Sequence, residues 1–273
     1  MNSKLGAEHP YTLGSMNNLA DAYKKVGRLD EALPLFEEAL KLRKVKLGAE
    51  HPDTLKSMNN LAMAYRDAAR LDEALPLFEE ALKLFETKLG AEHPNTLASM
   101  ENLIGAYLLA KQPEKAFPQF QRLIAAKRAQ VGADDAAFAG VLASVCLQLV
   151  KHGQFTAAEP YVRECLAIRA KAFPDDWRSF SAKSMLGAVL VGQAKEIYDS
   201  DAAAAAAKFA EAEPLLIEGY QGMKDRESQI PAAGKYNLAD AQQRLVDLYT
   251  AWNKLDEAAR WRKELDQSEP ASR

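Results

Sequence analysis

The chain has 273 residues and a formal net charge of −3, which argues against the basic footprint of a nucleic-acid-binding protein. No apolar run reaches the roughly 20 residues that a membrane-spanning helix needs. Alanine and leucine dominate while valine, isoleucine and threonine are sparse, and this composition favours helices over strands.

The sequence repeats itself with a period of 42 residues. The pentapeptide GAEHP begins at Gly6, Gly48 and Gly90, and the first two copies differ at only 10 of 42 positions. A third copy is more diverged, and in a fourth the pentapeptide is eroded to GADDA. Such self-similarity predicts a solenoid of stacked units. We expect one solenoid domain over 1–273, with units 6–47, 48–89, 90–131, 132–173, 174–228 (with an insertion) and a C-terminal cap 229–267.

Each copy contains two stretches of helical periodicity. In the second copy the first apolar stripe has spacings of 3, 3, 1 and 3, formed by Leu55, Met58, Leu61, Ala62 and Tyr65. A break at Ala69-Arg70 separates it from a second stripe that begins at Leu71, with acidic residues in the first turn where the helix dipole favours them. Pro76 is expected near the start of this second helix, where a missing N–H costs least.

The GAEHP segment predicts a helix stop, a short link and a helix start. Gly48 follows the last periodic residue as a helix C-terminal glycine does, and Pro52 suits a first helical position. The histidines of successive copies lie in adjacent units, about 10 Å or more apart, whereas zinc ligands lie ~2 Å from one ion. His9, His51 and His93 are therefore expected to cap helices or face solvent, and no metal site is expected.

The residues at the predicted helix contacts resemble the tetratricopeptide repeat (TPR). The pattern Leu19-Ala20…Tyr23…Ala32…Phe36…Ala39 matches its small and large positions, and LGAEHPYTLGSMNNLADAY resembles the long-repeat, kinesin light chain class that is also widespread in bacteria. The resemblance is strong over 1–131, and it implies an all-α, right-handed α-α superhelix of about six antiparallel helix pairs. Cys146 and Cys165 stand at small positions, so we expect buried thiols in a reducing compartment such as the cytoplasm.

The last two units depart from the pattern. The fifth has about a dozen extra residues that include Ala202–Ala207, and poly-alanine forms helix readily. We expect two extended helices with a turn near Tyr198–Asp201, and the alternative is a disordered insertion over 193–208. The sixth unit has a charged second helix, as a terminal cap does. At the other end, Ser3-Lys4-Leu5 matches the end of a second helix, so the first repeat has no cap.

In this family the first helix of each pair lines the concave groove. The resemblance implies that the residues outside the core stripe face it, namely Asn17, Asn18, Asp21, Lys24, Lys56, Asn59, Asn60, Met63, Arg66, Glu101, Asn102, Gly105, Leu108, Ala143, Ser144, Leu147 and Val150. Asparagine amides both donate and accept, so they can pair with an extended peptide backbone. The cations favour an acidic peptide, and Met63, Leu108 and Leu147 suit apolar anchors. The alternative is that Asn18, Asn60 and Asn102 tie neighbouring repeats together.

These features predict a binding scaffold rather than an enzyme. The sequence has no P-loop, G-x-G-x-x-G, H-E-x-x-H, G-x-S-x-G or C-x-x-C motif, so neither catalysis nor a cofactor is expected. The expected partner is a protein or peptide, acidic with apolar anchors, and neither nucleic acid nor a membrane. The alternative function is assembly, either by self-association through the uncapped N-terminal end or as a regulatory element of a larger signalling protein.

Overall fold

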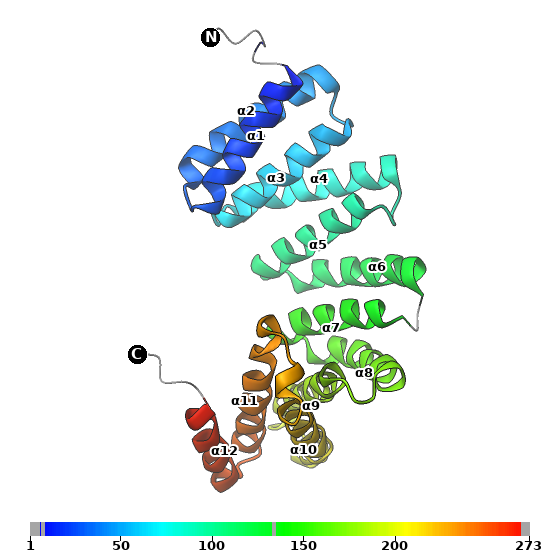
Figure 1. Ribbon diagram of the computed structural model, residues 1–273, viewed down its shortest axis with the longest axis vertical. Helices are drawn as coiled ribbons and strands as arrows, with labels where there is room; N and C mark the ends of the chain where they lie inside the picture. The colour runs from blue at the N-terminus through cyan, green and yellow to red at the C-terminus, as the bar shows by residue number, and fades with distance from the viewer. Residues whose placement is uncertain (1–5, 7–8, 133–134, 269–273) are drawn as a thin grey trace. The chain divides into compact units, whose positions relative to one another are not determined.

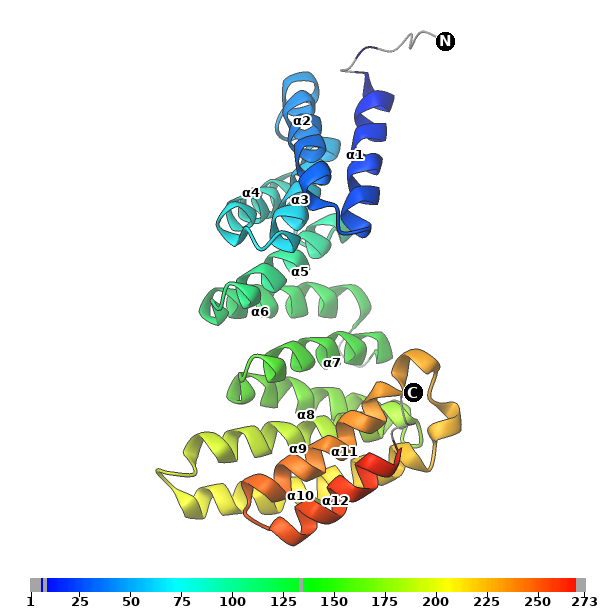
Figure 2. The same cartoon turned by 90° about the vertical axis from the view of Figure 1, so that its left-hand side faces the viewer.

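The computed structural model describes residues 6, 9–132 and 135–268 (Figures 1 and 2). The described residues form twelve α-helices and two short 3₁₀ turns, with no β-strand, which confirms the all-α prediction of about six helix pairs. The chain forms two compact units, Met1–Gln130 and Val131–Arg273. The prediction that all repeats make one solenoid domain stays a prediction.

The six helices α1 to α6 of the first unit are arranged in antiparallel pairs (Figure 1). The first helix of each pair packs against the second helix of the pair before it, so α2 contacts α3 and α4 contacts α5. The helices are α1 (Pro10–Lys25), α2 (Leu29–Leu47), α3 (Pro52–Asp67), α4 (Leu71–Leu89), α5 (Pro94–Leu109) and α6 (Pro113–Val131), whose last residue lies in the second unit.

The second unit also consists of helix pairs, and its middle pair is longer than the others. The α9 and α10 helices run side by side over 21 and 23 residues (Figure 2). The helices are α7 (Ala136–Lys151), α8 (Phe155–Ala172), α9 (Trp177–Ile197), α10 (Ala202–Lys224), α11 (Tyr236–Ala251) and α12 (Leu255–Ser268), with 3₁₀ turns at Glu227–Gln229 and Ala232–Gly234.

The GAEHP link has the predicted role of a helix stop and start. Gly48 follows the last residue of α2 with φ of 88°, a left-handed backbone that favours glycine. Pro52 is the first residue of α3, and His51 caps that helix by accepting the backbone N–H of Asp53 at Nδ1 over 3.2 Å. The same contact recurs at α1 and α5, and an aspartate takes the histidine's place at α7 and α9.

Pro76 is the sixth residue of α4, so it lies near the start of that helix as expected, but it lies beyond the first turn, where a missing N–H would cost least. The α4 helix begins at Leu71, where the carbonyl of Arg70 already accepts the N–H of Ala74. The acidic first turn extends the helix toward the N-terminus, which leaves Pro76 in the interior of the helix. Its missing N–H leaves one helical hydrogen bond unmade, and its ring is exposed to solvent.

Alanine lies at the contact between the two helices of each pair. Ala62 and Ala74 are both 0% exposed, and Phe78 beside them is also fully buried. The small side chains let the two backbones approach, and the larger ones fill the remaining space. In the second unit the thiols of Cys146 and Cys165 take such positions. Burial raises their pKa values, which fits the predicted structural role.

The insertion in the fifth unit is helical, as predicted, and the alternative of a disordered insertion is wrong. The α9 helix ends at Ile197, and α10 begins at Ala202 after Asp201 accepts the N–H of Ala204 over 2.9 Å. The two helices approach very closely, because a Cβ atom at Gly219 would lie 2.7 Å from the backbone nitrogen of Ser184. Poly-alanine propensity and this close packing together favour the extended helices.

In α3, α5 and α11, a tyrosine of the first helix donates a hydrogen bond to a glutamate of the preceding second helix. Tyr65 donates to Glu37 over 2.8 Å and Tyr107 donates to Glu79 over 2.6 Å, and Tyr249 in the second unit donates to a glutamate of α10 in the same way. Desolvation, together with the nearby Glu37 carboxylate, raises the pKa of Tyr65 to about 12. These bonds lock the register of successive pairs.

Replacing the cap tests the role of His51. We expect His51→Ala to lower the free energy of unfolding by about 1 kcal/mol, because one backbone N–H loses its acceptor. We expect His51→Asp to retain the cap and to add about 0.5 kcal/mol from the favourable helix dipole. Urea unfolding followed by far-UV circular dichroism measures both. Equal stability of the alanine and native proteins would contradict the capping role.

Removing one hydroxyl tests the bond between repeats. We expect Tyr65→Phe to lower the free energy of unfolding by about 1 kcal/mol, whereas Tyr23→Phe, whose hydroxyl has no hydrogen bond among the described residues, leaves it unchanged. The raised pKa means that the bond stabilises the native chain below pH 10 and that this stability is lost as pH rises toward about 12. Urea unfolding at several pH values should show a smaller alkaline loss in Tyr65→Phe, and equal losses would contradict the bond.

Candidate functional site

The polar residues predicted to line a groove do meet across the first helices of the first unit. Lys24 of α1 lies 3.8 Å from Asp67 of α3. The amide of Asn102 on α5 lies 3.7 Å from the sulfur of Met63 on α3. These contacts join residues from three successive first helices, namely Asp21, Lys24, Met63, Arg66, Asp67 and Asn102. We call these residues the polar row, and we include Asn18 and Asn60 because they stand at the repeat position of Asn102.

The amides differ in how far they are open to a partner. Asn18 is exposed, and Asn60 and Asn102 are half-buried. Asn17 and Asn59, one position earlier, turn inward, and their side-chain oxygens are buried and accept no hydrogen bond from the described residues. The contact of Asn102 with Met63 of the neighbouring repeat supports the alternative that these amides tie repeats together. An amide has enough donors and acceptors for both roles.

The cations of the row are balanced by carboxylates. Arg66 pairs with Asp67 over 2.9 Å, and Lys24 lies 3.8 Å from both Asp21 and Asp67. The ammonium of Lys25 hydrogen-bonds to Asp21 and, with Lys24, lowers the pKa of that carboxyl. An acidic ligand therefore competes with Asp21 and Asp67 for the cations of the row.

The other predicted residues of the first unit lie at varied depths. Lys56 is exposed and 3.8 Å from Asp53, and Glu101 is exposed and 3.6 Å from Lys127. Gly105 is half-buried, whereas Leu108 is 3% exposed and presents little surface to a partner. Of the predicted apolar anchors on this unit, Met63 is the accessible one.

Three predicted residues line a pocket in the second unit. Ala143, Ser144 and Leu147 of α7 face a pocket of about 270 Å³ whose opposite walls come from α9 and α11. Trp177 and Met185 of α9 and Tyr236 of α11 belong to those walls. Sequence reasoning missed these three residues because it carried the groove positions no further than the fourth repeat.

A second pocket of about 250 Å³ lies toward the carboxyl ends of the same helices. Its lining comes from four helices and consists of Val150, Phe155, Ala188, Val191, Gly192, Lys195, Arg244 and Asp247. We call it the Arg244 pocket. Val150 was predicted to face the groove, and Arg244 was missed. The signal that could have found it is its position in the repeat. Arg244 stands five residues before Tyr249, just as Asn60 stands five residues before Tyr65.

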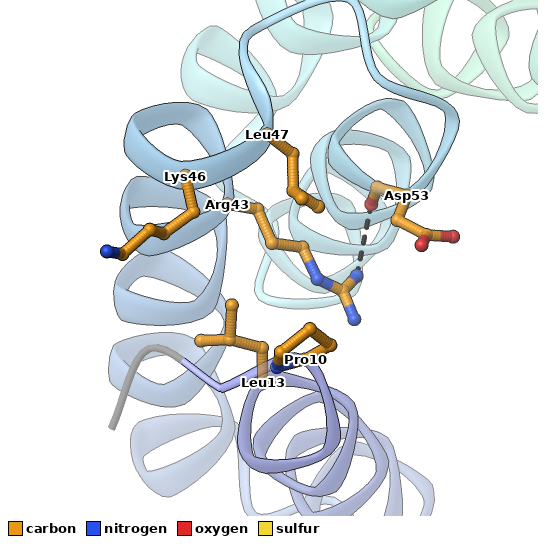
Figure 3. A pocket seen from close by; sticks show the side chains of 6 residues that line it. All are labelled: Pro10, Leu13, Arg43, Lys46, Leu47 and Asp53. Carbon is orange, nitrogen blue, oxygen red and sulfur yellow. Dashed lines mark hydrogen bonds between the residues drawn. The ribbon is translucent and has the colours of Figure 1, made fainter. Parts of the chain in front are cut away.

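A third pocket, of about 200 Å³, lies beside the amino ends of α1 and α3 (Figure 3). Arg43 points across it and donates to the backbone oxygen of Asp53 over 3.0 Å and to the hydroxyl of Ser57. Lys46 extends away from it (Figure 3). The guanidinium thus joins α2 to α3, so its charge has a structural role here.

The described residues offer no metal cluster and no membrane span. No three histidine, cysteine, aspartate or glutamate side chains among them lie close enough together to hold a metal ion. None of the described helices is both long and apolar enough to cross a bilayer.

The tetratricopeptide-repeat family profile matches residues 11–87 and, in a second overlapping placement, residues 53–129. Residues 11–129 carry tetratricopeptide repeats. The matched residues coincide with the three copies of highest similarity, and the polar row lies within them. No curated protein matches the sequence.

Solved structures resemble the TPR array over a larger part of the chain. The nearly identical TPR-like repeats of a Podosopora anserina protein described as a kinesin light chain give a TM-score of 0.65 at 24% identity, covering 80% of this chain and 98% of that one. BtubC (BKLC) from P. vanneervenii gives 0.58 at 23% identity, covering 81% and 85%. PilW, a type IV pilus biogenesis factor, gives 0.51 at 16% identity, covering 95% and 94%. These likenesses show a TPR-like fold.

Proposed function

We propose that this TPR array is a non-catalytic scaffold whose polar row binds an extended peptide segment of a partner protein. The observation that carries the proposal is the row itself, in which Lys24 meets Asp67 and Met63 meets Asn102 across successive first helices. Side chains placed at regular intervals along neighbouring helices suit a ligand that is itself extended. The same proposal assigns Ser144 and Leu147 to peptide contact in the pocket that they line.

The chemistry of the row favours the peptide backbone over any one side chain. Every peptide unit of an extended segment presents one donor and one acceptor, and an asparagine amide can satisfy both. Met63 adds a flexible apolar contact. Exposed Lys56 and the cations of the row favour an acidic segment, although Asp21 and Asp67 moderate that preference.

Peptide display on the whole chain tests the proposal. We expect selection from a random peptide library to enrich one motif, and the Asn18/Asn60/Asn102→Ala triple variant to bind it at least about tenfold more weakly, since each lost hydrogen bond contributes about 1 kcal/mol. Circular dichroism checks that the variant is folded. A matched control, Asn95→Ala, removes an amide outside the row.

The outcomes separate the two roles of the amides. Loss of binding in a folded triple variant, with binding retained by the control, supports the peptide row. Enrichment of no motif, or equal binding by the triple variant, contradicts it. A triple variant that binds normally but unfolds at lower urea concentration indicates that the amides tie repeats together.

Exposure of the first repeat favours a second function, self-association. Leu19 of α1 is 49% exposed, whereas its counterparts Leu61 and Leu103 are 4% and 2% exposed because the preceding pair covers them. Tyr23 likewise has no glutamate partner among the described residues, unlike Tyr65. We propose that this face of α1 joins another copy of the chain, or another domain of a larger signalling protein.

Light scattering at increasing concentration tests self-association. We expect the mass of the native chain to rise with concentration, and Leu19→Glu to remain monomeric because a charge on the contact face is costly to bury. Val45→Glu is the matched control, since Val45 is 72% exposed on α2. A native chain that stays monomeric throughout would contradict this function.

The same proposal places the chain in the cytoplasm. Cys146 and Cys165 are both free and buried, which suits a reducing compartment. Fractionation of the native cells tests this placement, and recovery of the chain outside the cytoplasm would contradict it.

A further inference from the structure

The Arg244 pocket combines an apolar floor with a cationic rim. Val191 of α9 is 5% exposed and lies on the floor with Val150 and Phe155. A Cβ atom at Gly192 would lie 2.3 Å from the ring of Phe155, so the glycine lets that ring lie directly on α9. Such a floor suits an apolar side chain of a ligand.

Arg244 has fewer partners than the other arginines of its unit that form ion pairs. Arg163, Arg178 and Arg226 lie 2.7, 2.8 and 3.4 Å from a carboxylate oxygen. Arg244 donates to the hydroxyl of buried Ser184 over 3.1 Å, and among the described residues no carboxylate forms an ion pair with it.

The acids nearest Arg244 in sequence do not satisfy it. Asp240 and Asp247 lie on the same helix and act on it only through their charge, and Asp247 accepts a hydrogen bond from Gln243 over 2.8 Å. Burial lowers the pKa of Arg244 despite these two charges. A half-buried guanidinium with several unused donors is costly, and a carboxylate that accepts two parallel N–H groups offsets that cost best.

We propose that the Arg244 pocket binds an acidic side chain of a partner's peptide segment, with the neighbouring apolar side chain of that segment on Val150, Phe155 and Val191. This inference rests on the proposed function and names the chemistry of the ligand in the second unit. Arg244 stands at the register position of Asn60, which the proposed function assigns to ligand contact, and it lines the pocket. At this position the first unit has the neutral amide of Asn60, and the second unit has the charged guanidinium of Arg244.

Charge complementarity and pocket size identify the occupant. Lys195 adds a second cation to the lining, against one acid, Asp247. A volume of about 250 Å³ exceeds what a carboxylate alone needs, and the apolar floor gives the remaining space to a leucine-sized or phenylalanine-sized group. A free anion would leave that floor unused, whereas a peptide segment uses both parts.

Peptide selection on the full chain and on Arg244→Met tests the inference. We expect the native chain to enrich peptides with Asp or Glu beside Leu, Ile or Phe, and Arg244→Met to lose the acidic preference. An enriched peptide is then synthesised with Glu and with Gln at the acidic position. Fluorescence polarisation should show about tenfold tighter binding of the Glu form to the native chain and equal binding of both forms to Arg244→Met.

Two further variants keep the test independent of folding. Asp247→Asn, an exposed position, should bind the Glu peptide about threefold more tightly because a like charge is removed. Arg244→Lys keeps the charge without the planar fork and should bind with intermediate affinity. The Asn18/Asn60/Asn102→Ala variant should retain the Glu preference, so failure of the polar row and failure of the Arg244 pocket remain distinguishable.

Several outcomes would overturn the inference. Equal binding of Glu and Gln peptides to the native chain would do so, as would an unchanged Glu preference in folded Arg244→Met, or no enriched acidic peptide at all. Displacement of the peptide by acetate alone, at constant ionic strength and millimolar concentration, would indicate a small-anion site instead. A mass that doubles without any peptide, and falls to the monomer in Arg244→Met, would identify a second copy as the occupant.

Discussion

The close contact between the two helices of a pair is the constraint on which the rest of this structure depends. Ala20 and Ala32 in the first pair, like Ala62 and Ala74 in the second, have no exposed surface. Small side chains let the backbones approach, and phenylalanine and leucine fill the space on either side. Within each unit, every pair then offers one apolar face to the next, and the unit is stable because successive pairs bury that face.

Residues outside this apolar stripe are free to vary without disturbing the fold. In the first unit they are amides and balanced ion pairs, such as Lys24 with Asp67. In the second unit the corresponding positions include Ser144, Met185 and Arg244, which line pockets between the first helices. One scaffold therefore presents two different chemistries. Packing determines the residues of the apolar stripe, whereas the residues beside the stripe can differ from unit to unit.

Much of the local structure follows from short-range signals. Gly48, His51 and Pro52 together end one helix and begin the next, and their effects act within a few residues. Pro76 shows the limit of such signals. A proline by itself indicates a helix that begins close to it, whereas α4 begins at Leu71 because the acidic turn before Pro76 is also helical. The helical insertion of the fifth unit was predictable from Ala202–Ala207, since alanine favours helix wherever nothing opposes it.

The sequence by itself determined the period, the helix pairs, their caps and the alanine contacts, because these depend on neighbouring residues or on near-identical adjacent repeats. Tertiary structure alone decided which outward-facing side chains find partners. It buried Leu108, paired Lys24 with Asp67, and brought Phe155 and Gly192 beside an arginine that has no carboxylate partner among the described residues. Those arrangements join residues tens of positions apart, in repeats whose sequences have diverged, so the periodic pattern does not predict them.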